Sequence, residues 1–108
     1  MNFQIINDDF YDHMWEYLNS MVPDFRPGFD RGDGAYLLLA EFWDFMVKNK
    51  NEDAILIKCA NFINEALVIG KHKTEAVIVS EIFQKMALNE EMGMKLKPLL
   101  SLNCKPSF

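Results

Sequence analysis

Apolar residues recur at helical spacing near the start of the chain. Within residues 8–22 they stand at offsets 0, 4, 7, 8 and 11, which predicts an amphipathic helix. The positions are Phe10, Met14, Tyr17, Leu18 and Met21. Asn7 can cap this helix, and Pro23 blocks its continuation. Asp8 and Asp9 fall in the first turn, where the positive end of the helix dipole favours carboxylates.

A loop follows, and after it comes the most apolar helix of the chain. Residues 23–34 hold two prolines and three glycines, a composition typical of a loop. Phe25 and Phe29 in this loop are expected to fold back on the core, although aromatic side chains flanked by charge are also typical of a binding loop. Residues 35–48 are apolar on more than one face, which predicts a central helix.

Caps and terminators indicate two further helices. Residues 52–69 form the third, with Asn51 as its N-cap and Gly70 as its terminator. The fourth begins after Thr74 as N-cap and extends through the segment AVIVSEIFQKMAL. A period of 3.6 residues fits this window and a period of two does not, which favours a helix over a strand.

A short last helix completes an all-α chain. This helix is predicted over residues 90–100, and Gly93 and Pro98 are expected to interrupt it. The tail 101–108 is expected to fray. With 108 residues, 50% of them apolar and 25% charged, the chain can sustain one core and is too short for two ordinary domains. The predicted fold is therefore a single-domain bundle of four to five helices over residues 1–108.

The composition also indicates where the protein resides. No apolar run reaches the ~18 residues that a membrane-spanning helix needs. The N-terminal segment MNFQIINDDF carries acids where a signal peptide would carry basic and then apolar residues. Cys59 and Cys104 match no zinc or redox motif, and a structural disulfide is not expected. These features predict a cytoplasmic protein.

Charge is distributed unevenly along the chain. Residues 1–53 have a net charge of −7 and residues 54–108 a net charge of +2, although the whole chain carries only −5. Clustered carboxylates repel phosphate backbones and anionic headgroups and attract basic surfaces. Direct binding of nucleic acid or membrane is therefore disfavoured. A basic protein is the partner that this charge favours, although acids also keep a small protein soluble without any partner.

The sequence contains no arrangement typical of an enzyme. His13 and His72 have no companions at the spacing of metal ligands, and His72 stands between two lysines. His13 and Glu16 lie one helical turn apart, but no serine or cysteine nucleophile accompanies them in a plausible sequence context. No phosphate-binding glycine motif is present. We therefore expect no catalytic residue, no metal and no cofactor.

The acidic first half also carries aromatic side chains. Carboxylates that steer a basic partner, together with aromatic anchors, are typical of a tight protein-binding surface. The residues expected to form it are Asp12, Glu16, Asp24, Asp30, Asp33, Glu41, Asp44, Trp15, Phe29 and Trp43.

A resemblance to a known class of proteins agrees with this surface. In its size, its acidic first half and the run KCANFINEALVIGKHKTEAVIVSEIF over residues 58–83, the chain resembles the small acidic helical immunity proteins of bacterial contact-dependent or polymorphic toxin systems. The resemblance implies neutralisation of one cognate toxin, commonly a nuclease with a basic cleft, by covering that cleft or an adjacent surface. It supplies no binding residues by position.

A second interpretation stays open at this point. The chain could be a helical adaptor or regulatory domain that forms a homodimer through an apolar face, with its acids present only for solubility. The sequence does not decide between a monomer and a homodimer.

Overall fold

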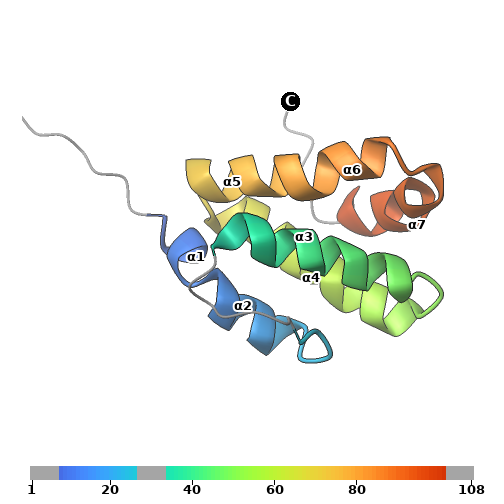
Figure 1. Cartoon of the computed structure of the whole chain (residues 1–108), viewed down its shortest axis with the longest axis horizontal. Helices are drawn as coiled ribbons and strands as arrows, with labels where there is room; N and C mark the ends of the chain where they lie inside the picture. The colour runs from blue at the N-terminus through green and yellow to red at the C-terminus, as the bar shows by residue number, and fades with distance from the viewer. Residues whose placement is uncertain (1–7, 27–33, 102–108) are drawn as a thin grey trace, which may run out of the picture.

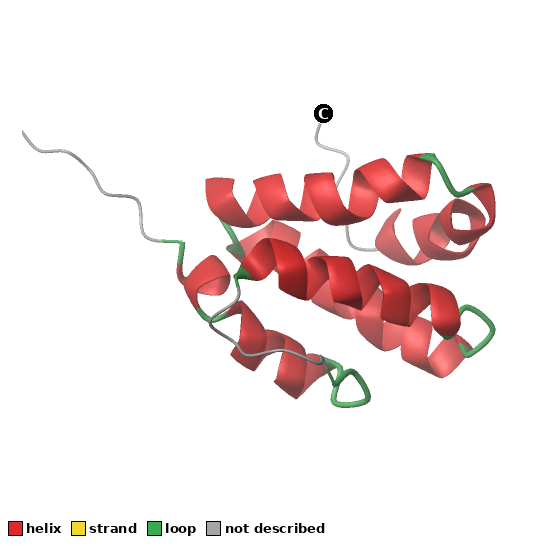
Figure 2. Cartoon of the chain, viewed as in Figure 1, coloured by secondary structure: helices red, strands yellow, loops and turns green. Residues whose placement is uncertain are grey.

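Helices, and no strands, make up the part of the chain that the structure describes (Figure 2). The structure is a computed structural model that describes residues 8–26 and 34–101. Its elements are α1 (Asp9–Asp12), α2 (Met14–Met21), α3 (Ala35–Lys48), α4 (Asp53–Ile69), α5 (His72–Ile78), the π-helical η2 (Val79–Phe83), α6 (Gln84–Ala87) and α7 (Glu90–Ser101). The prediction of an all-α fold is confirmed.

The helices are arranged around the antiparallel pair α3 and α4. In Figure 1, α3 lies in front of α4, the continuous run α5–η2–α6 borders α3 on one side, and α1 and α2 lie toward the other. Helix α7 packs on α4 and begins beside its start, where Lys50 Nζ lies 2.9 Å from Glu91 Oε1. Further along the same pair, Asn64 Nδ2 donates to the Leu99 carbonyl at 3.3 Å. These two contacts show that α4 and α7 run in the same direction.

A chain of aromatic contacts joins the first half of the fold to α4. The Phe42 ring of α3 lies 5.4 Å from Phe25 and 5.4 Å from Phe62 of α4, both edge-on. Phe62 also lies 5.4 Å from Phe10 of α1, which stacks on Tyr17 of α2 at 4.3 Å. Such pairs each contribute about 0.5–1.5 kcal/mol beyond the apolar area that they bury. The expectation that Phe25 folds back on the core is confirmed.

The predicted helix over 8–22 is two helices. The chain leaves helical geometry at His13, where φ is −119° and ψ is 28°. The two parts have different neighbours, since α1 packs on α5 and α2 packs mainly on α4. A straight helix could not pack against both α5 and α4. The break lets the chain change direction between these two neighbours.

Two predicted N-caps are wrong, because each helix begins at another residue. Glu52, and not Asn51, precedes the first residue of α4. Thr74 lies inside α5, whose N-cap is Lys71, and its side chain is fully buried. The predicted cap Asn7 lies outside the described residues. Of the tail 101–108, which was predicted to fray, Ser101 is the last residue of α7 and the rest lies outside the described residues.

The predicted interruption of the last helix is also wrong, because α7 is continuous through both Gly93 and Pro98. Gly93 is buried beside Met86 of α6, where even a Cβ would make only an ordinary contact with the Met86 carbonyl oxygen. Pro98 and Met94 are exposed, so water can bond the Met94 carbonyl that the proline cannot reach. The expectation of a helix over AVIVSEIFQKMAL is confirmed, with a π-helical stretch inside it.

Gly70 ends α4, as predicted, although its φ of −75° is one that any residue can adopt. The reason for a glycine is space. A Cβ at this position would overlap the Ala66 carbonyl oxygen and the Thr74 side chain, where α4 and α5 approach each other.

We expect Gly70→Ala to lower the free energy of unfolding by about 1–3 kcal/mol, the usual cost of overpacking. The matched control is Gly93→Ala, whose new Cβ would make an ordinary contact of 3.5 Å with the Met86 carbonyl oxygen. Since alanine is the better helix former, the control is expected to be neutral or to stabilise by up to about 1 kcal/mol. Urea denaturation measures both. Equal stability of the two variants would contradict this explanation of Gly70.

Candidate functional site

The acidic helices α1 and α2 are fastened to the rest of the fold through one buried carboxylate. Asp8 is only 3% exposed and accepts four hydrogen bonds. Its Oδ1 accepts from Tyr11 N at 3.2 Å and from Thr74 Oγ1 at 2.8 Å. Its Oδ2 accepts from Lys71 N at 3.1 Å and from Thr74 N at 2.8 Å. Asp8 therefore caps the starts of α1 and α5 together.

This arrangement requires the ionised form of Asp8. Burial by itself raises the pKa of the carboxyl, but the hydrogen bonds from Thr74, Tyr11 and Lys71 outweigh it and hold the pKa below the ordinary value of 3.8. An ionised carboxylate offers four acceptor sites, and here all four are used. The positive ends of two helix dipoles favour the same charge.

A surface hollow of about 440 Å³ lies on the outer side of α1 and α2. Its lining residues are Asp9, His13, Glu16, Tyr17 and Ser20. His13 Nδ1 lies 3.1 Å from Asp9 Oδ1, and the Tyr17 hydroxyl donates to Asp9 Oδ2 at 3.3 Å. The pKa of Tyr17 is raised above its ordinary value of 10.0, first by partial burial and then by the negative charges of Asp9 and Glu65. The phenol therefore stays protonated near neutral pH. The acidic character of the hollow comes from the carboxylates of Asp9 and Glu16.

The hollow does not form a catalytic triad. Asp9 orients His13 as a carboxylate orients a catalytic imidazole, but Ser20 stands seven residues beyond His13, about 10 Å along a helix. Cys59, the cysteine of the described residues, is fully buried. Burial raises the pKa of its thiol to about 12, which leaves it protonated and unreactive.

The structure separates the predicted binding residues into groups. Asp12 and Glu16 are exposed on α1 and α2, and Asp44 is exposed on α3, where Glu41 is half-buried. Asp24 is exposed but bonded to Lys58 of α4, with 3.0 Å between the carboxylate and the ammonium. The predicted residues Phe29, Asp30 and Asp33 lie outside the described residues.

The two predicted tryptophans differ in their positions. Trp43 is 7% exposed and belongs to the core, so the expectation that it is a surface anchor is wrong. Helix α3 buries a wide stripe against α4 and η2, and this stripe includes position 43. Trp15 is half-buried and packs against the core, and with Leu18, Asn19, Phe25 and Leu38 it lines a small cavity of about 20 Å³.

Two exposed apolar side chains on α3 were not among the residues predicted from the sequence. Tyr36 is 45% exposed and Leu37 is 56% exposed. Leu37 lies one helical turn before Glu41 and two turns before Asp44. The spacing of Leu37, Glu41 and Asp44 was a usable signal, because offsets of four and seven residues place side chains on one helical face. The uniform apolar character of residues 35–40 obscured it.

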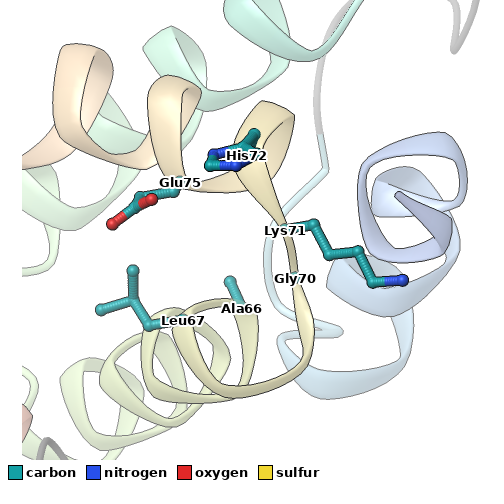
Figure 3. Close-up of a pocket in the computed structure, with 6 residues that line it drawn as sticks. All are labelled: Ala66, Leu67, Gly70, Lys71, His72 and Glu75. Carbon is teal, nitrogen blue, oxygen red and sulfur yellow. The ribbon is translucent and has the colours of Figure 1, made fainter. Parts of the chain in front are cut away.

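A second hollow, of about 360 Å³, lies where α4 meets α5 (Figure 3). Its lining includes Leu67, His72 and Glu75, while the Lys71 side chain points away from Leu67 and Glu75 in the view of Figure 3. Helix starts often bind anions through free backbone N–H groups. Here the backbone N–H groups of Lys71 and Thr74 already donate to Asp8, so this helix start is occupied by the protein's own carboxylate.

The described residues contain neither a membrane-spanning helix nor a cluster of metal-ligating side chains. Across 8–26 and 34–101, no helix has the length and the apolar character needed to cross a membrane. In the same two ranges, no group of three or more His, Cys, Asp or Glu residues is arranged to hold a metal ion. Comparisons with known protein families, with curated proteins and with solved structures found no match to this chain.

Asp8→Asn is expected to lower the free energy of unfolding by about 1–3 kcal/mol at pH 7, because an amide NH₂ would face two donors. Since the pKa in the folded state lies below 3.8, the ionised group stabilises the fold above that pH, and this contribution is lost as the pH falls through the folded-state pKa. The difference between the two proteins should therefore shrink as the pH falls below 3.8. Urea denaturation at several pH values tests this.

The control for Asp8 is Asp12→Asn, which changes an exposed carboxylate on α1. Its effect on stability should be small at neutral pH, and because this variant keeps Asp8, it should lose stability in acid as the wild-type protein does. A penalty for Asp8→Asn that is the same at neutral and at acid pH would contradict the role given to the ionised carboxylate.

Proposed function

We propose that this chain is an inhibitory binding protein of the immunity type, which neutralises a cognate basic protein through the acidic surface of its first three helices. The observation that carries the proposal is the charge of the described first half. Helices α1, α2 and α3 expose Asp12, Glu16 and Asp44, while the basic residues in 8–26 and 34–48 are Arg26 and Lys48. A toxin nuclease is the partner class that fits best, because its cleft binds phosphates and carboxylates can take their place.

The structural roles of some acids narrow the set that can bind a partner. Asp8 is committed to the starts of α1 and α5, and Asp24 is bonded to Lys58. The surface pair costs little to break, because exposed ion pairs contribute at most about 1 kcal/mol. The carboxylates of Asp12 and Asp44, both exposed, remain as the leading candidates for contact with a basic protein.

Fixed carboxylates serve this function better than mobile ones. Their positions are set before the partner arrives, so less conformational entropy is lost on binding. A concentrated negative surface also steers a basic partner and can raise association rates toward about 10⁸ M⁻¹ s⁻¹ at low salt. The proposed complex therefore forms fast and depends strongly on ionic strength.

The test is binding to the purified product of the gene immediately upstream, measured by surface plasmon resonance between about 50 mM and about 500 mM salt. We expect a complex whose association rate falls at least about tenfold over this range. The double variant Asp12→Asn/Asp44→Asn should associate several-fold more slowly. Glu90→Gln, an exposed carboxylate at the start of α7, is the matched control and should leave the rate unchanged.

Two results would contradict the proposal. One is the absence of any complex with that protein at low salt. The other is a complex whose rate is insensitive both to salt and to the double variant. Sedimentation of the chain alone addresses the alternative interpretation, because a concentration-independent homodimer without a basic partner would favour the adaptor.

A further inference from the structure

Helix α7 is joined to the rest of the fold through a stripe of apolar side chains. Met92 and Leu96 are fully buried and Leu100 is 6% exposed, and the three stand four residues apart on one side of the helix. The helix packs mainly on α4 and α6, away from α1 and α2 (Figure 1). Movement of α7 would therefore leave the acidic surface of the first three helices in place.

The polar contact between α4 and α7 is incomplete. Asn64 of α4 is 5% exposed, and its Nδ2 donates to the Leu99 carbonyl at 3.3 Å. Its Oδ1 is buried and has no hydrogen-bond partner among the described residues, whereas each oxygen of Asp8 has two donors. A buried acceptor without a donor destabilises the state that buries it. Water would bond Oδ1 once α7 moved away, so this atom favours separation of the two helices.

Two residues of α7 lower its own helical stability. Pro98 has no backbone N–H to donate to the Met94 carbonyl, and Gly93 also lies inside the helix. Glycine and proline are the two residue types with the lowest helix propensity. The ion pair of Lys50 with Glu91 is exposed to solvent, where such pairs contribute little to stability. Helix α7 is thus held in place mainly by the burial of its apolar stripe.

We propose that α7 is a lid that opens from α4 and α6 as a unit, while α3, α4 and the run α5–η2–α6 stay folded. An isolated helix of 12 residues is marginally stable in water, so the opened α7 loses its backbone hydrogen bonds. Opening uncovers Asn64, which contacts Leu99, and Met86, which lies beside Gly93. This device is independent of the proposed function, because it does not involve the acidic surface.

Native-state hydrogen exchange of the full chain, followed by NMR at low urea concentrations, tests the lid. We expect the amides of α7 to exchange as one group, at least about tenfold faster than those in the centre of α4. Their rates should depend less on urea than the rates of α4, because opening exposes less surface than complete unfolding.

Variants separate opening of the lid from complete unfolding. Pro98→Ala, at an exposed position, restores an N–H to the helix and should slow the exchange of α7 at least about tenfold. Asn64→Leu removes the unpartnered oxygen and should also slow it. The matched control is Asn61→Ala, at an exposed position of α4. It should slow exchange in the centre of α4 about threefold and leave α7 unchanged, because α4 stays folded when the lid opens.

Three results would overturn the lid. The first is exchange of α7 at the same rate as the centre of α4 in the wild-type protein. The second is an Asn61→Ala variant that slows α7 as much as α4, because α7 would then exchange only through complete unfolding. The third is unchanged exchange of α7 in both Pro98→Ala and Asn64→Leu.

Discussion

The fold depends on a carboxylate that is buried and fully hydrogen-bonded. Asp8 accepts from Tyr11 in its own helix and from Lys71 and Thr74 at the start of α5, so two helix starts share one anion. A buried charge without these donors would cost several kcal/mol, whereas here each oxygen has two partners. The contact links residues more than sixty positions apart and closes the first helices onto the α4–α5 corner. Gly70 contributes to the same corner, because only a residue without a side chain lets α4 and α5 approach so closely.

This constraint explains how an acidic segment can present its charge in fixed positions. Asp8 and Phe10 bind the inner side of α1 to α5 and α4, which leaves Asp12 and Glu16 on the solvent side. The net charge of a segment is therefore larger than the charge that is available to a partner, because some of the acids stabilise the fold. The exposed carboxylates of Asp12 and Asp44 remain for contact with the basic partner that we propose.

The hydrophobic pattern of the sequence predicted most of the helices correctly, but it did not predict where several of them begin and end. The helix over 35–48 and the termination at Gly70 follow from periodicity and from a residue type. The break at His13 follows from the packing of α1 and α2 on different helices. The start of α5 before Thr74 depends on Asp8, which local propensity cannot pair with a segment so far along the chain. For the candidate site, the sequence identified the acidic residues of the first helices. It misplaced Trp43, because a helix that is apolar on several sides does not reveal which aromatic ring faces inward.

Hydrogen exchange of the Asp8→Ala variant tests most directly whether Asp8 fastens the acidic helices to the rest of the fold. The account predicts that amides of α1 and α2 exchange at least about tenfold faster than in the wild-type protein, while those in the centre of α4 keep their protection. Unchanged exchange in α1 and α2, or an equal loss of protection in every helix, would contradict it.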